Sequence, residues 1–333
     1  MSTTPLPQST AAAAAPLTRL IGIARSRSSL LYPLVALAVL IIWFSIASPY
    51  FFTLGNMFNI GRGSAVLLLV ALAGTVVIII GSIDLSVAGT VTLTGVICAL
   101  LIDRAGLLVA VVAAIGVGGL VGAANGLLVQ WLRIPSFLVT LGMLSITIGI
   151  AQAVNNNAPV QFRNRELGRI VNGELWGIPT VVILPLVVLA IVTFAAYRTR
   201  AGRYMYAIGG GEAVAAASGV PAFRYKVIAF VLSGVLCGLA GVVVTGQIGA
   251  GTLDVGGALL LDSVAAVVMG GTALSGGVGG PQRTLLGVLV IAVLGNGMGI
   301  LGFTNYTQSI IKGVVIIFAV ALSIDRKKYG IIK

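Results

Sequence analysis

Ten long apolar runs recur along this chain, and they constrain its fold more than any other feature. They lie at about 30–48, 63–81, 86–102, 107–130, 137–153, 179–197, 227–247, 259–274, 284–302 and 308–324. A helix needs about 20 mostly apolar residues to cross a bilayer. The runs show no apolar/polar alternation, for example at 66–80 and 109–120, which excludes a β-barrel. We therefore predict an all-α integral membrane protein with about ten transmembrane helices.

The composition agrees with burial in lipid and excludes several classes of function. Only 8% of the 333 residues are charged, whereas soluble domains carry about 25%. The net charge of +12 is expected to come from basic loops beside a membrane, so no nucleic-acid partner is predicted. The chain has no histidine, and both Cys98 and Cys237 lie inside apolar runs. Neither a metal site nor a disulfide framework is therefore expected.

The distribution of basic residues predicts that both ends of the chain are cytoplasmic. Ten spans put the two ends on one side, and an inside N-terminus places 14 of the 20 basic residues inside. These are Arg19, Arg25, Arg27, Arg133, Arg198, Arg200, Arg203, Arg224, Lys226, Arg283, Arg326, Lys327, Lys328 and Lys333. We predict a tail at 1–29 without fixed structure, one membrane domain at 30–325, and a basic tail at 326–333.

Glycine-rich segments interrupt two of the predicted spans. The first is Gly-Ser-Ile-Asp-Leu-Ser at 81–86, and the second is Gly-Gly-Thr-Ala-Leu-Ser-Gly-Gly at 270–277. Non-helical backbone at membrane depth is tolerated only where protein or a water-filled cavity surrounds it. The interruptions indicate a translocation path or close helix packing. The two segments are loosely alike, but the sequence does not decide whether an internal repeat exists.

The cytoplasmic loop at 198–226 contains a short helix that cannot be stable alone. Three glycines at 209–211 are expected to break the chain, and Glu212 then precedes the alanine-rich stretch 213–217. Gly219 and Pro221 are expected to end the helix. Two isolated turns need a partner surface. That surface is either the protein's own helix ends or a separate cytoplasmic subunit.

The sequence lacks the features of an ATPase or an enzyme. It contains no G-x-x-x-x-G-K-[S/T] motif, so it cannot bind ATP through a P-loop. Without histidine it has no Ser-His or Cys-His pair. We predict no catalytic residues in this chain.

Several stretches resemble the ribose/simple-sugar permease family of ABC importers, which is related to the branched-chain amino acid permeases. They run in order over about residues 45–325, and they are 49–60, 81–87, 134–142, 202–219, 262–277, 296–297 and 308–313. The chain departs from the usual pattern of that family at Ala88, at Leu260-Leu261 and at 278–281. These departures concern local geometry and substrate more than mechanism.

The resemblance implies a transporter made of several chains. Two permease subunits, as a homodimer or a heterodimer, would form the path, and a separate ABC ATPase would bind ATP and Mg²⁺. A periplasmic or lipid-anchored binding protein would deliver a ribose-like monosaccharide across a bacterial inner (plasma) membrane. By carry-over, the residues that form or flank the ATPase-coupling helix would be Gly209, Gly210, Glu212, Ala213, Ala216, Ser218 and Gly219.

Four polar residues are candidates for the translocation path: Asp84, Ser86, Asn125 and Asn296. An ionisable residue inside a membrane is a functional candidate by default. Asp84, however, is expected near the cytoplasmic end of the second span, where Asp84 and Ser86 also suit the N-cap of the next helix. For Asn125 and Asn296 a hydrogen bond between helices is the simpler role.

The alternative function is an ion-gradient-driven secondary transporter of a small polar solute. Such a protein needs an intramembrane ion site, which is often built from carboxylates. The predicted spans offer few acids apart from Asp84. The sequence therefore favours the ABC permease, but it does not identify the solute.

Overall fold

The structure, a computed structural model, describes residues 15–323, with side chains from 31 to 318 except at 258. The predicted C-terminal tail and residues 1–14 of the predicted N-terminal tail lie outside this part. Its helices are α1 (Ala15–Ala47), α2 (Leu54–Ile79), α3 (Val87–Ala105), α4 (Leu107–Leu132), α5 (Ser136–Asn155), α6 (Glu166–Asn172), α7 (Thr180–Arg198), α8 (Arg200–Gly210), α9 (Glu212–Ala217), α10 (Ala222–Ile248), α11 (Gly256–Met269), α12 (Pro281–Ile300) and α13 (Asn305–Ser323). Two short antiparallel pairs join β1 (Val160–Gln161) to β4 (Ala250–Gly251), and β2 (Glu174–Leu175) to β3 (Ile178–Pro179).

The predicted helical architecture is confirmed. Each of the ten apolar runs overlaps one helix, and these helices are α1–α5, α7 and α10–α13. Within the described residues, seven of these helices are long and apolar enough to cross a membrane, namely α2, α3, α4, α5, α7, α10 and α12. Helices α1 and α11 contribute shorter apolar segments, Leu31–Ala47 and Leu259–Met269. Helix α1 begins at Ala15, which is well before the expected start of the first span.

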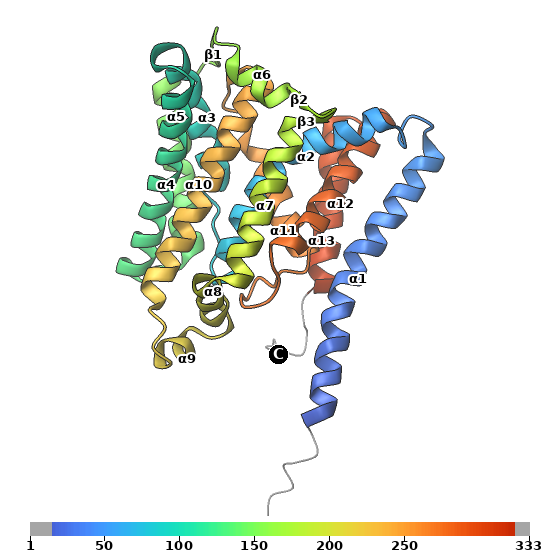
Figure 1. Cartoon of the computed structure of the whole chain (residues 1–333), viewed down its shortest axis with the longest axis vertical. Helices are drawn as coiled ribbons and strands as arrows, with labels where there is room; N and C mark the ends of the chain where they lie inside the picture. Colours follow the sequence, from blue (N-terminus) through green and yellow to red (C-terminus); the bar gives the residue numbers. More distant parts are fainter. Residues whose placement is uncertain (1–14, 324–333) are drawn as a thin grey trace, which may run out of the picture.

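The long helices form two groups around α2 and α7 (Figure 1). Helices α3, α4, α5 and α10 pack together on one flank, and α1, α11, α12 and α13 pack on the other. Strands β1–β3 and helix α6 cover one end of the bundle, which we call the α6 side. Helices α8 and α9 lie at the opposite end, which we call the α8 side.

Helix α2 is the core of the bundle. All residues from 64 to 73 are buried, and the helix contacts α7, α10, α11 and α12. A helix that is apolar and buried on every face is typical of the centre of a large or membrane-embedded protein. Other helices expose large apolar side chains outward, for example Ile46 of α1, Leu120 of α4 and Ile191 of α7. Such surfaces are suited to lipid or to a neighbouring membrane subunit.

Glycines allow α4 and α10 to pack backbone against backbone. A Cβ atom added to Gly118 would overlap the carbonyl oxygen of Gly234, and one added to Gly122 would overlap that of Phe230. In lipid, helices associate through such close approach because apolar contact between them brings little gain over contact with lipid. The extensive α4–α10 packing therefore depends on residues without side chains.

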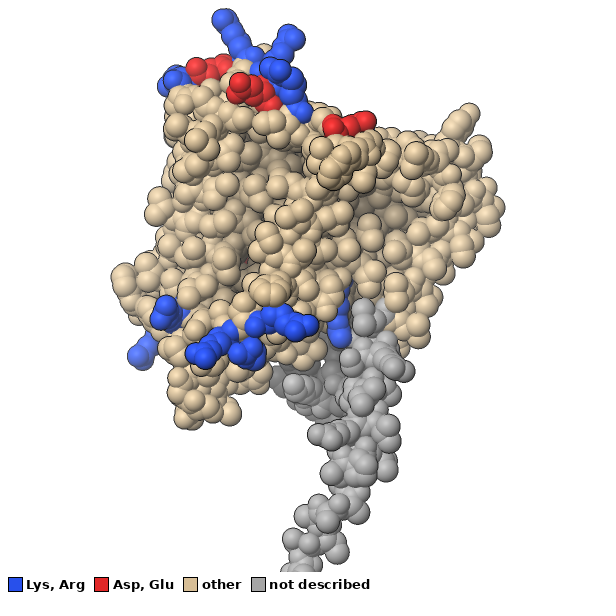
Figure 2. Space-filling model, in the orientation of Figure 1, with Lys and Arg blue, Asp and Glu red and all other residues tan. Residues whose placement is uncertain are grey.

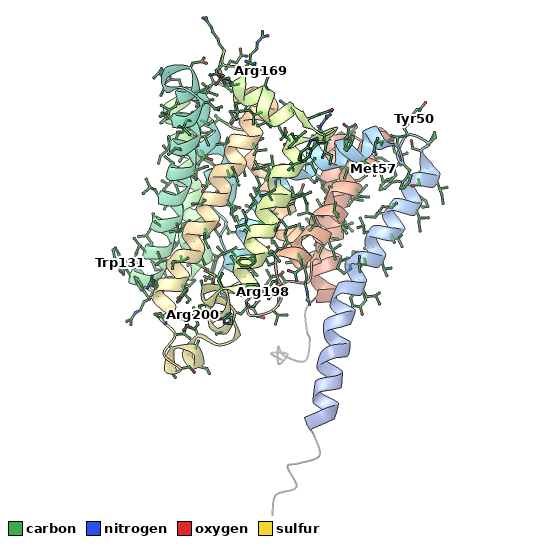
Figure 3. All side chains as sticks on the ribbon, in the orientation of Figure 1. Tyr50, Met57, Trp131, Arg169, Arg198 and Arg200 are labelled. Atoms are coloured by element: carbon green, nitrogen blue, oxygen red, sulfur yellow. The ribbon has the colours of Figure 1, made fainter. Side chains whose placement is uncertain are left out.

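On the face shown in Figure 2, charged residues gather at the two ends of the molecule and leave a band without charged residues between them. Arg169 lies on the α6 side, whereas Arg198 and Arg200 lie on the α8 side (Figure 3). The visible acidic residues lie on the α6 side in the view of Figure 2. The α8 side is thus the more basic end of the bundle on this face.

Two polar contacts join neighbouring helices. Asn56 of α2 and Asn296 of α12 exchange two amide hydrogen bonds of 2.9 Å each. Lys312 of α13 donates to Asp262 of α11 at 2.7 Å between Nζ and Oδ2. A charge in lipid is tolerated when it is paired, so this ion pair fastens α13 to α11.

Gly122→Ala should lower the stability of the folded permease by about 1–3 kcal/mol, because the new methyl group overlaps the backbone of α10. Thermal unfolding in detergent micelles would measure this. Gly116→Ala in the same helix is the matched control, since its Cβ meets nothing within 4 Å. Equal melting temperatures for the two variants would contradict the proposed packing role.

Candidate functional site: the α8–α9 loop and the two helix breaks

The loop at 198–226 contains two helices, of which the sequence analysis found one. Helix α8 begins after Thr199, whose side chain accepts a hydrogen bond from the Gly202 amide at 3.1 Å. The expectation that all of 209–211 breaks the chain was wrong. Gly209 and Gly210 form the last turn of α8, and only Gly211 separates α8 from α9. The signals for α8 were its capping threonine and the apolar residues Met205 and Ile208 at helical spacing.

Helix α9 is the predicted short cytoplasmic-loop helix, and its end is specified locally. The amide of Gly219 donates to Ala216, and the amide of Val220 donates to Ala215, both at 3.0 Å. These two bonds are a Schellman motif, which requires the left-handed conformation that Gly219 adopts with φ +81°. The sequence prediction of a helix stop at Gly219 is confirmed.

Helix α9 presents a row of small exposed residues outward. Ala215 is buried at 5% exposure, whereas Val214 on the outer face is 73% exposed. Ala213, Ala216, Ser218 and Gly219 are exposed as well. Glu212 pairs with Lys226 at the start of α10, at 2.5 Å between carboxylate and ammonium. One face of α9 thus rests on the bundle, and the opposite face is open.

The two glycine-rich interruptions end their helices in the same way. After α2, the amides of Gly81 and Ser82 donate to Ile78 and Val77. After α11, the amides of Gly271 and Thr272 donate to Val268 and Val267. Gly81 and Gly271 both have positive φ, at +75° and +82°. The likeness seen in the sequence therefore extends to backbone hydrogen bonding, and the chain is non-helical at 80–86 and 270–280, as expected.

Side chains satisfy the backbone exposed by the first break. The Ile83 amide donates to the Ser136 hydroxyl, and the Leu85 amide donates to the Thr140 hydroxyl, both at 3.0 Å. In a bilayer an unpaired backbone group costs several kcal/mol. Helix α5 therefore supplies the partners that α2 and α3 lack at this point.

The second break is held by α2, α7 and α8. Its Gly277 amide donates to the carbonyl of Ile79, at the end of α2, at 2.9 Å. The hydroxyls of Tyr197 and Tyr206 both donate to the Gly279 carbonyl, at 3.1 and 2.9 Å. Burial raises the pKa of the Tyr206 phenol above its ordinary value, and Tyr197 adds to this. The phenol therefore keeps the proton that it donates.

Five glycines from three segments meet at one point on the α8 side. We call this cluster the glycine junction: Gly81, Gly209, Gly210, Gly276 and Gly277. A Cβ atom on Gly276 would lie 2.7 Å from the Cα of Gly81 and 3.0 Å from that of Gly209. A Cβ atom on Gly277 would lie 2.8 Å from the Cα of Gly210. The end of α8 is therefore in direct backbone contact with both helix breaks.

Asp84 lies in the first break and is buried inside the bundle. Its carboxylate accepts from the Ser86 amide at 3.0 Å, the Ser86 hydroxyl at 2.6 Å and the Ser233 hydroxyl of α10 at 2.9 Å. Ser233 is seven residues along α10 from Lys226, or about 10 Å at the rise of an α-helix. Asp84 is therefore deeper than the sequence analysis placed it.

The expected capping role of Asp84 and Ser86 was only partly right. Ser86 is the residue before α3, but its side chain makes no capping hydrogen bond. Its hydroxyl instead donates to Asp84 and accepts from the Asn125 amide at 2.8 Å. Asn125 is fully buried, and the Oδ1 oxygen of its side-chain amide has no hydrogen-bond partner among the described residues. Asp84, Ser86 and Asn125 thus form one network that joins α3, α4 and α10.

Asn296 does not belong to that network. It pairs with Asn56 between α12 and α2, so the structure separates it from the other three path candidates. The predicted hydrogen bond between helices is confirmed for Asn296, whereas Asn125 donates to Ser86 in the first break, directly before α3.

Comparison with known proteins identifies the family. The model of the "Branched-chain amino acid transport system / permease component" family matches residues 56–320. The chain belongs to this permease family. It is thus a transport subunit of the permease type, a multi-pass protein of the bacterial inner membrane, and not an enzyme.

Individual relatives match over nearly the whole chain. The ribose import permease protein RbsC of Escherichia coli (strain K12) is 38% identical over 89% of this chain and 93% of the relative. RbsC of Bacillus subtilis (strain 168) is 35% identical over 89% and 92%. The D-allose transport system permease protein AlsC of Escherichia coli (strain K12) is 35% identical over 86% and 89%.

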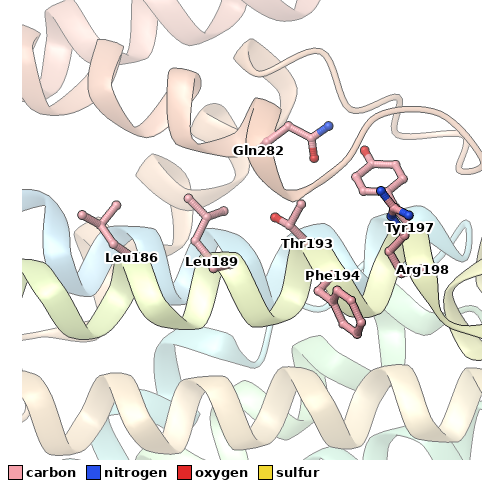
Figure 4. Close-up of a pocket in the computed structure, with 8 residues that line it drawn as sticks. Leu186, Leu189, Thr193, Phe194, Tyr197, Arg198 and Gln282 are labelled. Carbon is pink, nitrogen blue, oxygen red and sulfur yellow. The ribbon is translucent and has the colours of Figure 1, made fainter.

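A groove on the flank of this permease is mostly apolar (Figure 4). It runs along α7, with Gln282 of α12 on its other side. Its lining comprises Leu186, Leu189, Ala190, Thr193, Phe194, Tyr197, Arg198 and Gln282. A sugar site needs several convergent hydrogen-bonding groups, and the Tyr197 hydroxyl already serves Gly279. This groove is therefore suited to lipid tails or an apolar helix rather than to a sugar.

The partners of several charged and polar residues were not predicted from the sequence. Asp262 and Lys312 form an ion pair between α11 and α13. Ser233 was not predicted as a site residue, because a serine inside an apolar run carries no distinguishing signal. A single acid and a single base in two neighbouring apolar runs were a usable signal for the ion pair.

Asp84→Ala should destabilise the permease by at least about 2 kcal/mol, since it leaves buried donors on Ser86 and Ser233 without an acceptor. Asp84→Asn should cost less, because its amide oxygen still accepts and the Ser233 hydroxyl can accept from its amide. Thermal unfolding in detergent would rank the three proteins. A stability of Asp84→Ala equal to that of the unchanged protein would exclude the structural role of the network.

Proposed function

We propose that this chain is the transmembrane permease subunit of an ABC importer that takes up a ribose-like monosaccharide. The relatives named for ribose import and D-allose transport support this substrate class. The match along 86–89% of this chain supports a shared transport role rather than a shared fragment. The individual sugar follows from the binding protein that delivers it, because a permease path can bind its solute weakly.

We also propose ten membrane spans with both ends and the α8 side in the cytoplasm. The ten long helices alternate in direction, and helix α1 begins on the α8 side (Figure 1). The basic residues of the α8 side support a cytoplasmic position under the positive-inside rule. They are Arg133, Arg198, Arg200, Arg203, Arg224, Lys226 and Arg283. In this proposal residues 30–325 form one membrane domain, with tails at 1–29 and 326–333.

The open face of α9 carries the proposal of an ATPase partner. Helix α9 has six residues, and one face of it rests on the permease while its small residues face outward. A helix this short gains most of its stability from packing. The docking surface consists of Glu212, Ala213, Ala216, Ser218 and Gly219, and Gly209 and Gly210 flank it from α8. ATP and Mg²⁺ would bind in the partner ATPase.

We place the path between two permease subunits, which are either two copies of this chain or two related chains. Asp84, Ser86 and Asn125 remain candidates for shaping that path, because their network holds the first helix break. Asn296 is a more distant candidate, since it serves the α2–α12 contact. A periplasmic or lipid-anchored binding protein would dock on the α6 side. The secondary-transporter alternative gains no support from a specific contact, since Asp262 is already paired with Lys312.

Reconstituted vesicles test this function directly. The permease is assembled in vesicles with its ATPase, and the sugar-loaded binding protein is added outside. Uptake of radiolabelled D-ribose and D-allose is then measured with and without ATP in the vesicle lumen, which corresponds to the cytoplasm. We expect uptake only when all three components and ATP are present. Uptake by the permease alone, driven by a proton or sodium gradient, would refute the proposal.

Ala213→Arg or Ala216→Arg should separate ATP hydrolysis from uptake. A long charged side chain on the open face of α9 obstructs docking, while the buried face and membrane insertion stay unchanged. Uptake and co-purification of the ATPase should both fall at least about tenfold, which corresponds to about 1.4 kcal/mol of lost binding. Ala213→Ser is the matched control with a small side chain at the same position. Normal uptake in both arginine variants would exclude α9 as the docking helix.

A further inference from the structure

We infer that helix α8 is a relay that moves both helix breaks together when the ATPase acts on the neighbouring helix α9. This inference rests on the proposed function and extends it from the docking surface to the contacts that α8 makes with the two breaks. The positioning residues are Gly209, which contacts both breaks, and Tyr206, which holds the second one. Three sets of contacts carry the inference.

The first contact joins α8 to the end of α2. A Cβ atom on Gly209 would overlap the carbonyl oxygen of Ile79, so the two backbones already touch. Ile79 is the last residue of α2, directly before the first break. Any displacement of the end of α8 toward the membrane therefore pushes on the start of that break.

The second contact joins α8 to the second break. A Cβ atom on Gly209 would lie 2.5 Å from the Gly277 amide nitrogen. The Tyr206 hydroxyl adds a hydrogen bond of 2.9 Å to the Gly279 carbonyl. One turn of α8 thus holds the second break by steric contact on one side and by a hydrogen bond on the other.

The third contact joins the two breaks to each other. The Gly277 amide donates to the Ile79 carbonyl at 2.9 Å, and a Cβ atom on Gly276 would lie 2.6 Å from the Gly81 amide nitrogen. Packed backbone transmits displacement with little loss, because protein interiors are dense and barely compressible. The glycine junction and the turn of α8 that contains Tyr206 therefore move as one unit.

The link to α9 is short and stiff. Only Gly211 separates α8 from α9, and its amide still donates to Ala207 and Ile208 of α8 at 3.2 Å. Its carbonyl accepts from the Ala215 amide of α9 at 2.9 Å. A partner that moves α9 would move α8 as well, because the connection contains no slack segment.

The test uses a cysteine reporter in the second break of the complete transporter. Ser275 is exposed in that break, and both native cysteines are buried, so Ser275→Cys gives one reactive thiol. The rate of its alkylation by a maleimide is measured in lipid nanodiscs without nucleotide and after trapping with ATP and vanadate. We expect the rate to change at least about fivefold, the lower end of typical coupling between sites. No change in a complex that hydrolyses ATP would overturn the inference.

Gly209→Ala in the reporter protein should abolish most of this ATP-dependent change. The added methyl group displaces α8 from Ile79 and Gly277. Gly116→Ala adds the same methyl group to a helical glycine with free space and should keep the full change. An unaltered response in Gly209→Ala would contradict the relay, and so would an equal loss in Gly116→Ala.

Tyr206→Phe decides the question if Gly209→Ala does not assemble, since it adds no atoms. It should reduce the ATP-dependent change by about two- to tenfold, the effect of one lost hydrogen bond. Tyr204→Phe, on the same helix and in edge-on contact with Tyr225, should not. An unchanged response in Tyr206→Phe would overturn the inference. Failure of the unchanged permease to assemble with an ATPase or to support ATP hydrolysis would instead refute the proposed function.

Discussion

The requirement that every backbone amide and carbonyl inside a bilayer finds a partner governs this structure. Unbroken helices meet the requirement by themselves, and so they are free to face lipid on the outside of the bundle. The two breaks cannot meet it alone. Hydroxyls of α5 accept hydrogen bonds from amides of the first break, and phenols of α7 and α8 donate to a carbonyl of the second. The breaks are therefore placed where three or four other helices converge, and the bundle is organised around them.

Glycine makes this convergence possible in two ways. At Gly81 and Gly271 it provides the positive φ that ends α2 and α11 with the same hydrogen bonds. At Gly209 and Gly276 it permits contact between backbones that any side chain would prevent. The same residue type thus interrupts the helices and then packs the interruptions together. The 45 glycines of the chain reflect tight packing in lipid more than flexibility.

The sequence sufficed for the helices but not for their contacts. Apolar runs located all ten long helices, because a span must be long and uncharged whatever its neighbours are. Helix α8 was missed because it is short, amphipathic and outside the apolar runs, so its stability comes from packing beneath α2. Ser233, 149 residues from Asp84, and Asn56, 240 residues from Asn296, could not be paired in advance. Such pairings depend on how helices are ordered around α2, which no local pattern encodes.

The ion pair between Asp262 and Lys312 has a consequence for biosynthesis. The two residues are 50 positions apart, so the ribosome delivers α11 to the membrane before α13 exists. Asp262 therefore has no partner until α13 is inserted and Lys312 pairs with it. An unpaired charge in an apolar setting is costly. Insertion of α13 thereby completes the flank formed by α11, α12 and α13, and a chain cut short before α13 keeps an unpaired carboxylate.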